Sequence, residues 1–470
     1  MYQSIDRMLL EFKECFKRVK TWQWFVVLVI GLMVRSSHRG VTSILSALRL
    51  KPELYHTMLH FFRSTGYRVN DLYGKWVKTA MKHGAMKRIA GRVVLLGDHI
   101  KVSKEGLRMP GIEILHQDSQ NSGKPSFIAG HNYGQVSAVT TNGQTSRSIP
   151  LMTEIQASPP RKDGTKKPAG DTIVTQMVNL VHKTAESIAE PVVVALDAYF
   201  SSESAWRAAD KTIIETGERL VEIVTRAQTN SVAYTDFIPP TVRKRGRPRK
   251  YGEKLELYGL FSDMSSFTQT TMTLYGKKGK VRYFCIDLLW KPVDKLVRFV
   301  AVETESGICV LMSTSLALHP EAIIEIYALR FKIETSFDEQ KNDMGAFAYH
   351  FWSKSLPKRK KFKKTEPVFD AHHVKRVDDA RRATESFVCM CTIATGIITL
   401  IAFSHNCEIW KRYPGWIRTL RSLTPTASIV KETLAHDFPA VLSLYPHLSI
   451  CSIVRSRLRT LTFLYRDFAA

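Results

Sequence analysis

The side chains with the clearest capacity for chemistry lie around position 334, in a segment whose pattern predicts a helix. Four of them stand at positions i, i+3, i+7 and i+14: Tyr327, Arg330, Glu334 and Lys341. At about 100° per residue, these positions fall within an arc of roughly 60°. One helix would therefore present a tyrosine, two cations and one carboxylate to a single substrate. An ordinary amphipathic helix is also charged on its outer face, but it does not predict this combination.

The other side of the same helix is apolar and indicates which face is buried. Its apolar positions lie roughly 200° to 280° around the axis from Tyr327. They are Ile326, Leu329, Ile333 and Phe337. This side is expected to pack on a sheet while the polar stripe meets the substrate.

Two aspartates follow apolar runs that predict buried β-strands. Val93–Leu96 leads to Asp98, and Val192–Leu196 leads to Asp197. Both aspartates are thus expected at strand ends, where ligands and metals gather in open α/β sheets. Together with Glu334 they could hold two divalent ions about 4 Å apart for phosphodiester displacement. Taken singly, each aspartate also fits an ordinary turn residue or strand-end cap.

These segments together resemble a known family. The stripe Y-x2-R-x3-E-x6-K resembles the YREK signature of bacterial insertion-sequence DDE transposases of the insertion-sequence-four type. The segment GDHIKVSKEGLRMPG, with Asp98, resembles the first-aspartate region of that family, and VVVALDAYFSS, with Asp197, resembles the second. The aspartates are 99 positions apart, and Glu334 follows the second by 137, which leaves room for the β-rich insertion that the resemblance implies. The likeness covers roughly residues 10–400.

The resemblance implies an RNase H-like catalytic core that works with two Mg²⁺ ions, for which Mn²⁺ can substitute. Asp98, Asp197 and Glu334 would be the catalytic metal ligands, and such hard oxygen donors suit Mg²⁺. His99 follows the first aspartate where related sequences often carry an acidic or small polar residue. We assign His99 no role in metal or DNA binding.

The resemblance also implies a set of DNA contacts. Tyr327, Arg330 and Lys341 would meet phosphates of the transposon end, Arg330 through forked hydrogen bonds and Lys341 as a point charge. Lys104, in the first-aspartate region, is expected to join this set. Relatives that cut through a DNA hairpin stack a flipped base on an aromatic residue of the insertion. Trp290 is the candidate here, although a core tryptophan fits its position equally well.

A second DNA signal is the run RKRGRPRK at Arg243–Lys250. Its centre, Arg245-Gly246-Arg247-Pro248, resembles the core of an AT-hook, in which two arginines enter the narrow minor groove of A·T-rich DNA. Six basic residues in eight also suit any phosphate backbone. A solvated loop is the alternative.

The composition agrees with a polyanionic partner. Lys and Arg number 68 against 43 Asp and Glu, a net charge of +25. The seven cysteines are scattered without a CxxC pair, which excludes a recognisable disulfide framework or zinc ribbon. The expected partner is double-stranded DNA, as inverted repeats at the transposon ends and as target. A homodimer is expected as well, because two ends must be joined.

Two apolar runs raise the question of a membrane. Phe25–Val34 is too short to span a bilayer, and Phe387–Phe403 contains several threonines and a glycine. Both are predicted to be buried helices. The first twenty residues mix acidic and basic side chains and predict no secretory signal. The expected location is the bacterial cytoplasm, at the nucleoid.

The predicted fold is a mixed α/β sheet flanked by helical terminal regions. Its expected regions are a helical DNA-binding domain (1–90), the first part of the catalytic core (91–236), a β-rich insertion with the AT-hook-like loop (237–311), the second part of the core with the YREK helix (312–356), a basic linker (357–383) and a C-terminal helical region, the candidate dimer contact (384–470).

The sequence therefore predicts a DNA transposase that cuts the ends of its element and transfers them to target DNA. Two other functions are weighed against it. The first is a non-catalytic DNA-binding protein derived from a transposase, against which all three acids speak. The second is a membrane-surface protein that uses basic patches and the helix around Phe387–Phe403.

Overall fold

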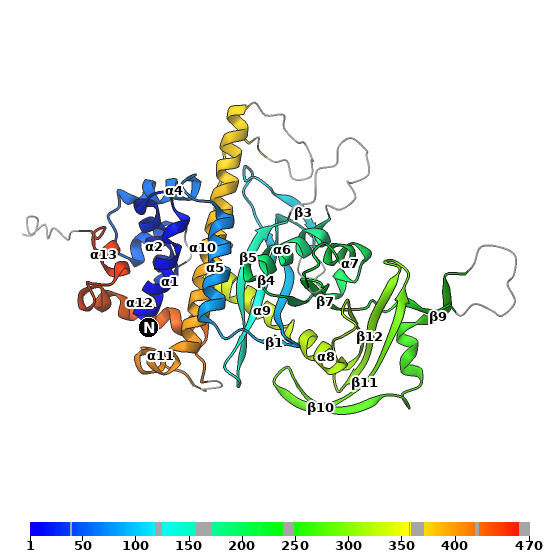
Figure 1. The fold of residues 1–470 in the computed structure, drawn as a ribbon. Coiled ribbons are helices and arrows are strands. Elements are labelled where there is room, and N and C mark those ends of the chain that lie inside the picture. The colour runs from blue at the N-terminus through cyan, green and yellow to red at the C-terminus, as the bar shows by residue number, and fades with distance from the viewer. Residues whose placement is uncertain are drawn as a thin grey trace, which may run out of the picture.

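A long mixed β-sheet runs through the molecule and has helices on both faces (Figure 1). The structure is a computed structural model that describes residues 1–37, 40–117, 125–156, 172–215, 217–237, 249–356, 358, 371–418 and 423–459. The centre of the AT-hook-like run, with Arg245 and Arg247, and most of the basic linker lie outside the described residues.

Thirteen strands of the described chain join in this sheet. They are β1 (Arg88–Ile89), β2 (Arg92–Ser103), β3 (Glu113–His116), β4 (Phe127–Thr141), β5 (Ser146–Ile155), β6 (Val192–Ala195), β7 (Val221–Arg226), β8 (Val232–Asp236), β9 (Tyr251–Glu256), β10 (Thr268–Leu274), β11 (Lys277–Trp290), β12 (Lys295–Thr304) and β13 (Gly307–Ser313).

The described helices fall into two groups, those on the sheet and those of a terminal bundle. The first are α6 (Ile173–Ile188), η2 (Ala198–Phe200), α7 (Glu203–Ala209), η3 (Leu257–Ser262), α8 (Pro320–Leu329), α9 (Lys332–Asp338) and the π-helical turn η4 (Glu339–Asp343). The second are α1 (Tyr2–Glu11), η1 (Phe12–Cys15), α2 (Val19–Val34), α3 (Thr42–Ala47), α4 (Leu54–Arg63), α5 (Val69–His83), α10 (Ala371–Ser404), α11 (Asn406–Arg412), α12 (Ala427–Leu444) and α13 (Ser449–Arg455).

The centre of the sheet is formed by β2, β6 and β7, which are parallel. Their side chains alternate between two apolar cores, so that Val93 and Leu95 face α6 and α7 while Val94 and Leu96 face α8 and α9. Continuous apolar runs are typical of strands that are covered on both faces. The predicted buried strands are therefore confirmed.

The position of Asp98 differs from the prediction. Asp197 directly follows β6, as expected, but Asp98 lies within β2. The parallel pairing of β2 with β6 stops at Leu96, whereas its antiparallel pairing with β4 continues to Ser103. Asp98 therefore lies just beyond the parallel ladder, on a strand that its hairpin partner extends.

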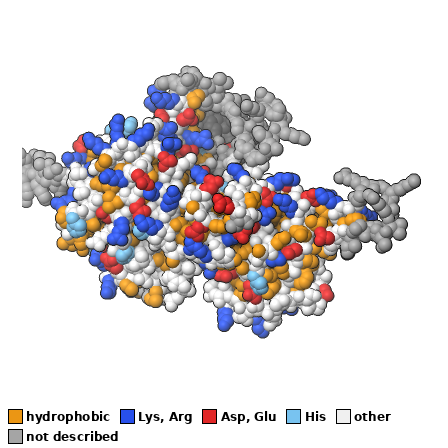
Figure 2. Space-filling view, in the orientation of Figure 1, with side chains coloured by type: hydrophobic (Ala, Val, Ile, Leu, Met, Phe, Trp, Pro, Cys, Tyr) orange, Lys and Arg blue, Asp and Glu red, His pale blue; other side chains and the backbone are white. Residues whose placement is uncertain are grey.

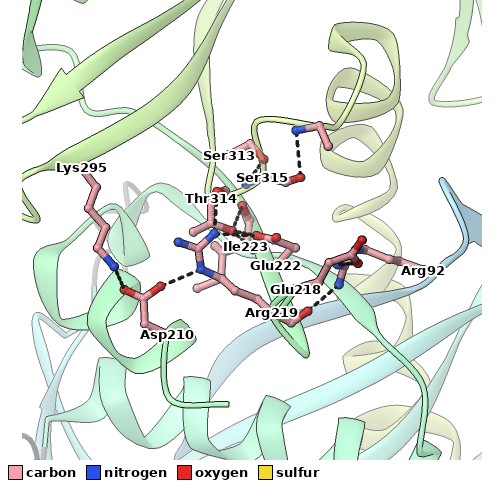
Figure 3. Close-up of polar contacts among 11 residues, drawn as sticks. Arg92, Asp210, Glu218, Arg219, Glu222, Ile223, Lys295, Ser313, Thr314 and Ser315 are labelled. Carbon is pink, nitrogen blue, oxygen red and sulfur yellow. Dashed lines mark hydrogen bonds and ion pairs between the residues drawn. The ribbon is translucent and has the colours of Figure 1, made fainter. Parts of the chain in front are cut away.

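The predicted β-rich insertion consists of antiparallel strands that continue the same sheet. The joint is the pairing of β13 with β7, where Leu311 lies opposite Arg226. A polar network around Asp210 reinforces this joint (Figure 3). Asp210, after α7, accepts a hydrogen bond of 2.6 Å from Arg219 Nε and one of 2.7 Å from Lys295 Nζ of β12. Burial would raise the pKa of Asp210, but these two cations lower it.

The two chain ends fold into one helical bundle, and α10 stands between this bundle and the sheet (Figure 1). Helix α2 is buried along nearly its whole length and packs against α10, α12 and α13. Lys431 of α12 donates to the carbonyl of Leu32 at 2.8 Å, and the buried Arg35 donates to that of Met344 at 2.7 Å. The regions predicted as 1–90 and 384–470 thus share a core.

The two apolar runs are buried helices, as predicted. One described helix, Val374–Ser404, is long and apolar enough to cross a membrane, and 94% of its most apolar window is buried inside the fold. The shorter run belongs to α2. On the drawn face of the molecule, basic side chains are spread over both the bundle and the sheet, with acidic ones among them (Figure 2).

Candidate active site

The helix predicted to carry the YREK stripe is interrupted twice. Helix α8 ends at Leu329, α9 begins at Lys332, and the π-helical turn η4 follows from Glu339. At the first joint, the backbone amides of Arg330, Ile333 and Glu334 bond to carbonyls three residues earlier, which tightens the turn. The apolar side is confirmed, because Ile326, Ile333 and Phe337 are buried against the sheet.

The structure brings Arg330 of the polar stripe to Asp98. Arg330 Nη1 lies 3.2 Å from Asp98 Oδ2, and Arg330 Nη2 lies 3.5 Å from Glu334 Oε1. The backbone N–H of His99 donates to Asp98 Oδ1 at 2.8 Å. One guanidinium therefore joins a carboxylate of the sheet to a carboxylate of α9.

Electrostatics show that the three acids share one environment. Burial raises the pKa of Asp98 to about 6, and the charges of Asp197 and Glu334 add to this effect. The backbone N–H of His99 and the charge of Arg330 act in the opposite direction. A cation near these carboxylates would relieve their mutual repulsion.

The residues present fit a divalent metal ion by their chemistry. Within the described part of the chain, no three His, Cys, Asp or Glu side chains are close enough together to hold an ion as they stand. Arg330 instead supplies the positive charge between Asp98 and Glu334. Carboxylate oxygens, together with water and substrate phosphates, are the hard donors that Mg²⁺ takes in proteins.

Tyr327 and Lys341 lie on the same segment as the acids. Tyr327 is partly buried, burial raises its pKa to about 12, and its hydroxyl senses the charges of Arg330 and Asp197. Lys341 is exposed on η4. Because η4 is π-helical, Lys341 is not on the regular α-helical stripe that the spacing predicted.

Sequence reasoning missed Arg226. It is the last residue of β7, it is exposed, and its charge acts on both Tyr327 and Tyr275. The available signal was its place directly after Leu220–Thr225, a run with the pattern of a buried strand that follows the one ending at Asp197.

The tip of the β10–β11 hairpin was missed as well. Its Tyr275 packs edge-on against Phe331 of the stripe segment, with ring centroids 6.5 Å apart. Three exposed lysines follow the tip: Lys277, Lys278 and Lys280. The hairpin thus carries positive charge next to the helix that bears Glu334.

Two predicted DNA contacts are not brought to this site. Lys104 is buried, its Nζ donates to the backbone carbonyls of Phe347 and Tyr349, and it lies 3.7 Å from the ring centroid of Tyr349. Trp290 is buried against Trp206, with centroids 5.1 Å apart. The core alternative left open for Trp290 is the one that the structure shows, and neither residue can reach DNA in this conformation.

His99 points away from the acids. Its Nε2 lies 2.5 Å from Gln156 Oε1, and its ring stacks on Phe200. Burial lowers its pKa to about 4, so the ring is neutral at physiological pH. Since Phe200 follows Asp197 by three residues, the stacked pair joins the two segments that bear the aspartates.

Comparison with known proteins gives one family. A family model described as DDE superfamily endonuclease matches residues 11–279, more than half of the chain, and this stretch includes Asp98 and Asp197 but ends before Glu334. No curated protein matches the sequence. Nucleases of this superfamily generally use divalent metal ions. The chain belongs to the DDE superfamily endonucleases.

Proposed function

We propose that this protein is a DNA transposase of the insertion-sequence-four type with a YREK signature. It would bind the terminal inverted repeats of its element, cleave them by two-metal phosphodiester hydrolysis and transfer the 3′ ends to target DNA. Family membership supports a metal-dependent nuclease that acts on DNA. The observation that carries the proposal is the contact of Arg330 with both Asp98 and Glu334, beside Asp197.

Asp98, Asp197 and Glu334 would hold two Mg²⁺ ions, for which Mn²⁺ can substitute. When bound, such a pair activates the attacking oxygen and stabilises the leaving oxygen of a phosphodiester. Arg330 would then exchange its carboxylate partners for a phosphate of the scissile strand, which its planar fork suits.

The cations around the acids are proposed to hold the DNA backbone. Lys341 is exposed on η4, and Arg226 is exposed at the end of β7. Tyr327 would add a hydroxyl to this set. Arg245 and Arg247 remain proposed contacts to the minor groove.

The assignment as an RNase H-like core is supported by the sheet. Its three parallel strands β2, β6 and β7 are bordered by the antiparallel strands β4 and β5, with acids at the ends of the parallel ladder. A homodimer that joins two DNA ends in the bacterial cytoplasm completes the proposal.

One observation favours the alternative of a non-catalytic DNA-binding protein derived from a transposase. Arg330 fills the place between Asp98 and Glu334, so it must move before these acids can hold an ion. A conformation locked in this way would bind DNA without cutting it.

A nicking assay in Mg²⁺ tests the proposal, with duplex DNA that carries the sequences flanking the reading frame. Wild-type protein should cut at the ends of the inverted repeats. Asp197→Asn and Glu334→Gln should keep DNA affinity and lose cutting, whereas Glu53→Gln, an exposed acid at the start of α4, should cut like wild type. Equal cutting by the first two variants would exclude the catalytic role, and binding without cutting by wild type would favour the alternative.

A further inference from the structure

Gln135 is a fully buried amide on β4, the strand next to β2 near one end of the sheet. It lies on β4 directly opposite Asp98 of β2, so the two side chains share one face. A glutamine amide offers two N–H donors and two acceptor positions. A buried amide without partners would be costly, so the partners of Gln135 explain its presence.

All four positions of this amide are in use. Nε2 donates to Ser137 Oγ and to Ser336 Oγ, both at 3.0 Å. Oε1 accepts from Thr153 Oγ1 at 3.2 Å and from Gln340 Nε2 at 2.6 Å. Two of the bonds remain within the sheet, and two cross to the segment that carries Glu334 and Lys341.

The two crossing bonds reach residues near Glu334 and Lys341 in the chain. Ser336 lies two residues after Glu334 on α9, and Gln340 lies one residue before Lys341 on η4. Both side chains are fully buried. Gln135 therefore links α9 and the π-helical turn to β4, the strand that pairs with the Asp98 segment of β2.

Helix α9 needs an outside anchor of this kind. It has seven residues, and it begins at a tight joint and ends in a π-helical turn. A helix this short has little stability of its own. A slip by one residue would turn Glu334 by about 100° away from Asp98.

We propose that Gln135 is a positioning residue that sets Glu334 and Lys341 relative to Asp98. The inference rests on the proposed function, because it concerns the same three acids. Gln135 acts through Ser336 and Gln340 and touches neither metal nor DNA. Partners of this kind that orient metal ligands typically change metal affinity about 10- to 100-fold when removed.

Two serines allow a matched test. Ser336 and Ser137 are both fully buried, and each accepts a hydrogen bond of 3.0 Å from the same Nε2. Ser336→Ala cuts the link to α9, whereas Ser137→Ala cuts an equal link inside β4. Both variants should lower the thermal midpoint by a similar amount, so a difference in metal binding cannot come from stability alone.

The experiment measures Mn²⁺ binding to the full-length protein without DNA, by the electron paramagnetic resonance signal of free Mn²⁺. We expect Ser336→Ala to weaken binding about tenfold and Ser137→Ala to bind like wild type. The Mg²⁺ concentration that gives half-maximal nicking should shift in the same order, and Gln135→Leu should show the largest shift.

Equal Mn²⁺ binding by the two serine variants would overturn the positioning role and leave the proposed function standing. If the wild-type protein bound no Mn²⁺, the metal site itself would be refuted, and the role of Gln135 with it. The two failures are therefore distinguishable.

Discussion

Gly396 of α10 tests how the helix between the bundle and the sheet is packed. A methyl group at this position would lie far inside van der Waals contact with Cζ2 of Trp76 on α5, with the neighbouring ring atoms 2.7 and 2.9 Å away. Trp76 is fully buried, and its Nε1 donates to the carbonyl of Pro150 on β5 at 2.8 Å. Gly396→Ala must therefore displace this ring or separate α10 from α5.

The expected cost follows from three contributions. Overpacking costs about 1–3 kcal/mol, loss of the buried bond to Pro150 costs about 1–3 kcal/mol, and alanine gains about 1 kcal/mol in helix propensity. The net destabilisation of Gly396→Ala is thus about 3 kcal/mol, the difference between these central values. Local opening that is easier by this amount corresponds to amide exchange faster on the order of 100-fold.

Hydrogen–deuterium exchange of α5 and α10 measures this effect segment by segment. Gly74→Ala is the control on α5, because its added methyl group would meet only Ser187 Oγ, at 3.9 Å. Gly74→Ala should slow exchange slightly through helix propensity. If Gly396→Ala left exchange in α10 unchanged, the helix would not pack on Trp76 as described, and a lipid-facing α10 would regain support.

Three further predictions concern pH, salt and the terminal bundle. Burial raises the pKa of Glu339 to about 7 against a lowering effect of Arg147, so the folded state favours the protonated acid. The free energy of unfolding of the wild type should therefore fall by up to about 3 kcal/mol as the pH rises from about 4.5 to about 7. In Glu339→Gln, the pH profile of urea unfolding should be flatter. Changing Lys277, Lys278 and Lys280 together to glutamine should lower the salt slope of DNA binding by about 2–3, as measured by fluorescence anisotropy, and an unchanged slope would remove the hairpin tip from the DNA surface. Residues 1–90 expressed alone should show no cooperative thermal unfolding by circular dichroism, because their central helix is buried against α10, α12 and α13; a sharp transition would contradict the shared core.

The central strands and one side of the stripe helix could be predicted from the sequence. Continuous apolar runs such as Val192–Leu196 have few alternatives to a strand covered on both faces. The buried positions Ile326, Ile333 and Phe337 follow from helical periodicity alone. These features depend on local pattern, which is what a sequence shows directly.

The rest depends on contacts between distant segments. The interruption at Arg330 and the turn η4 are invisible to periodicity, because they are held by partners such as Gln135 and Arg35. Lys104 is a residue type that often contacts DNA. Its ammonium group is instead buried, where it donates to two backbone carbonyls. Arg226 reaches the site only because β7 lies beside β6.

The proposed metal ligation by Asp98 is tested most directly by a change of donor atom. In Asp98→Cys a soft thiolate replaces a hard carboxylate oxygen, which disfavours Mg²⁺ more than Mn²⁺. The measurement is the ratio of nicking rates in Mn²⁺ and Mg²⁺ for this variant and for wild type. If Asp98 holds the metal, cutting in Mg²⁺ should be lost, Mn²⁺ should restore part of it and the ratio should rise at least about tenfold. Cutting by Asp98→Cys in Mg²⁺ at the wild-type rate, with an unchanged ratio, would show that Asp98 is not a metal ligand.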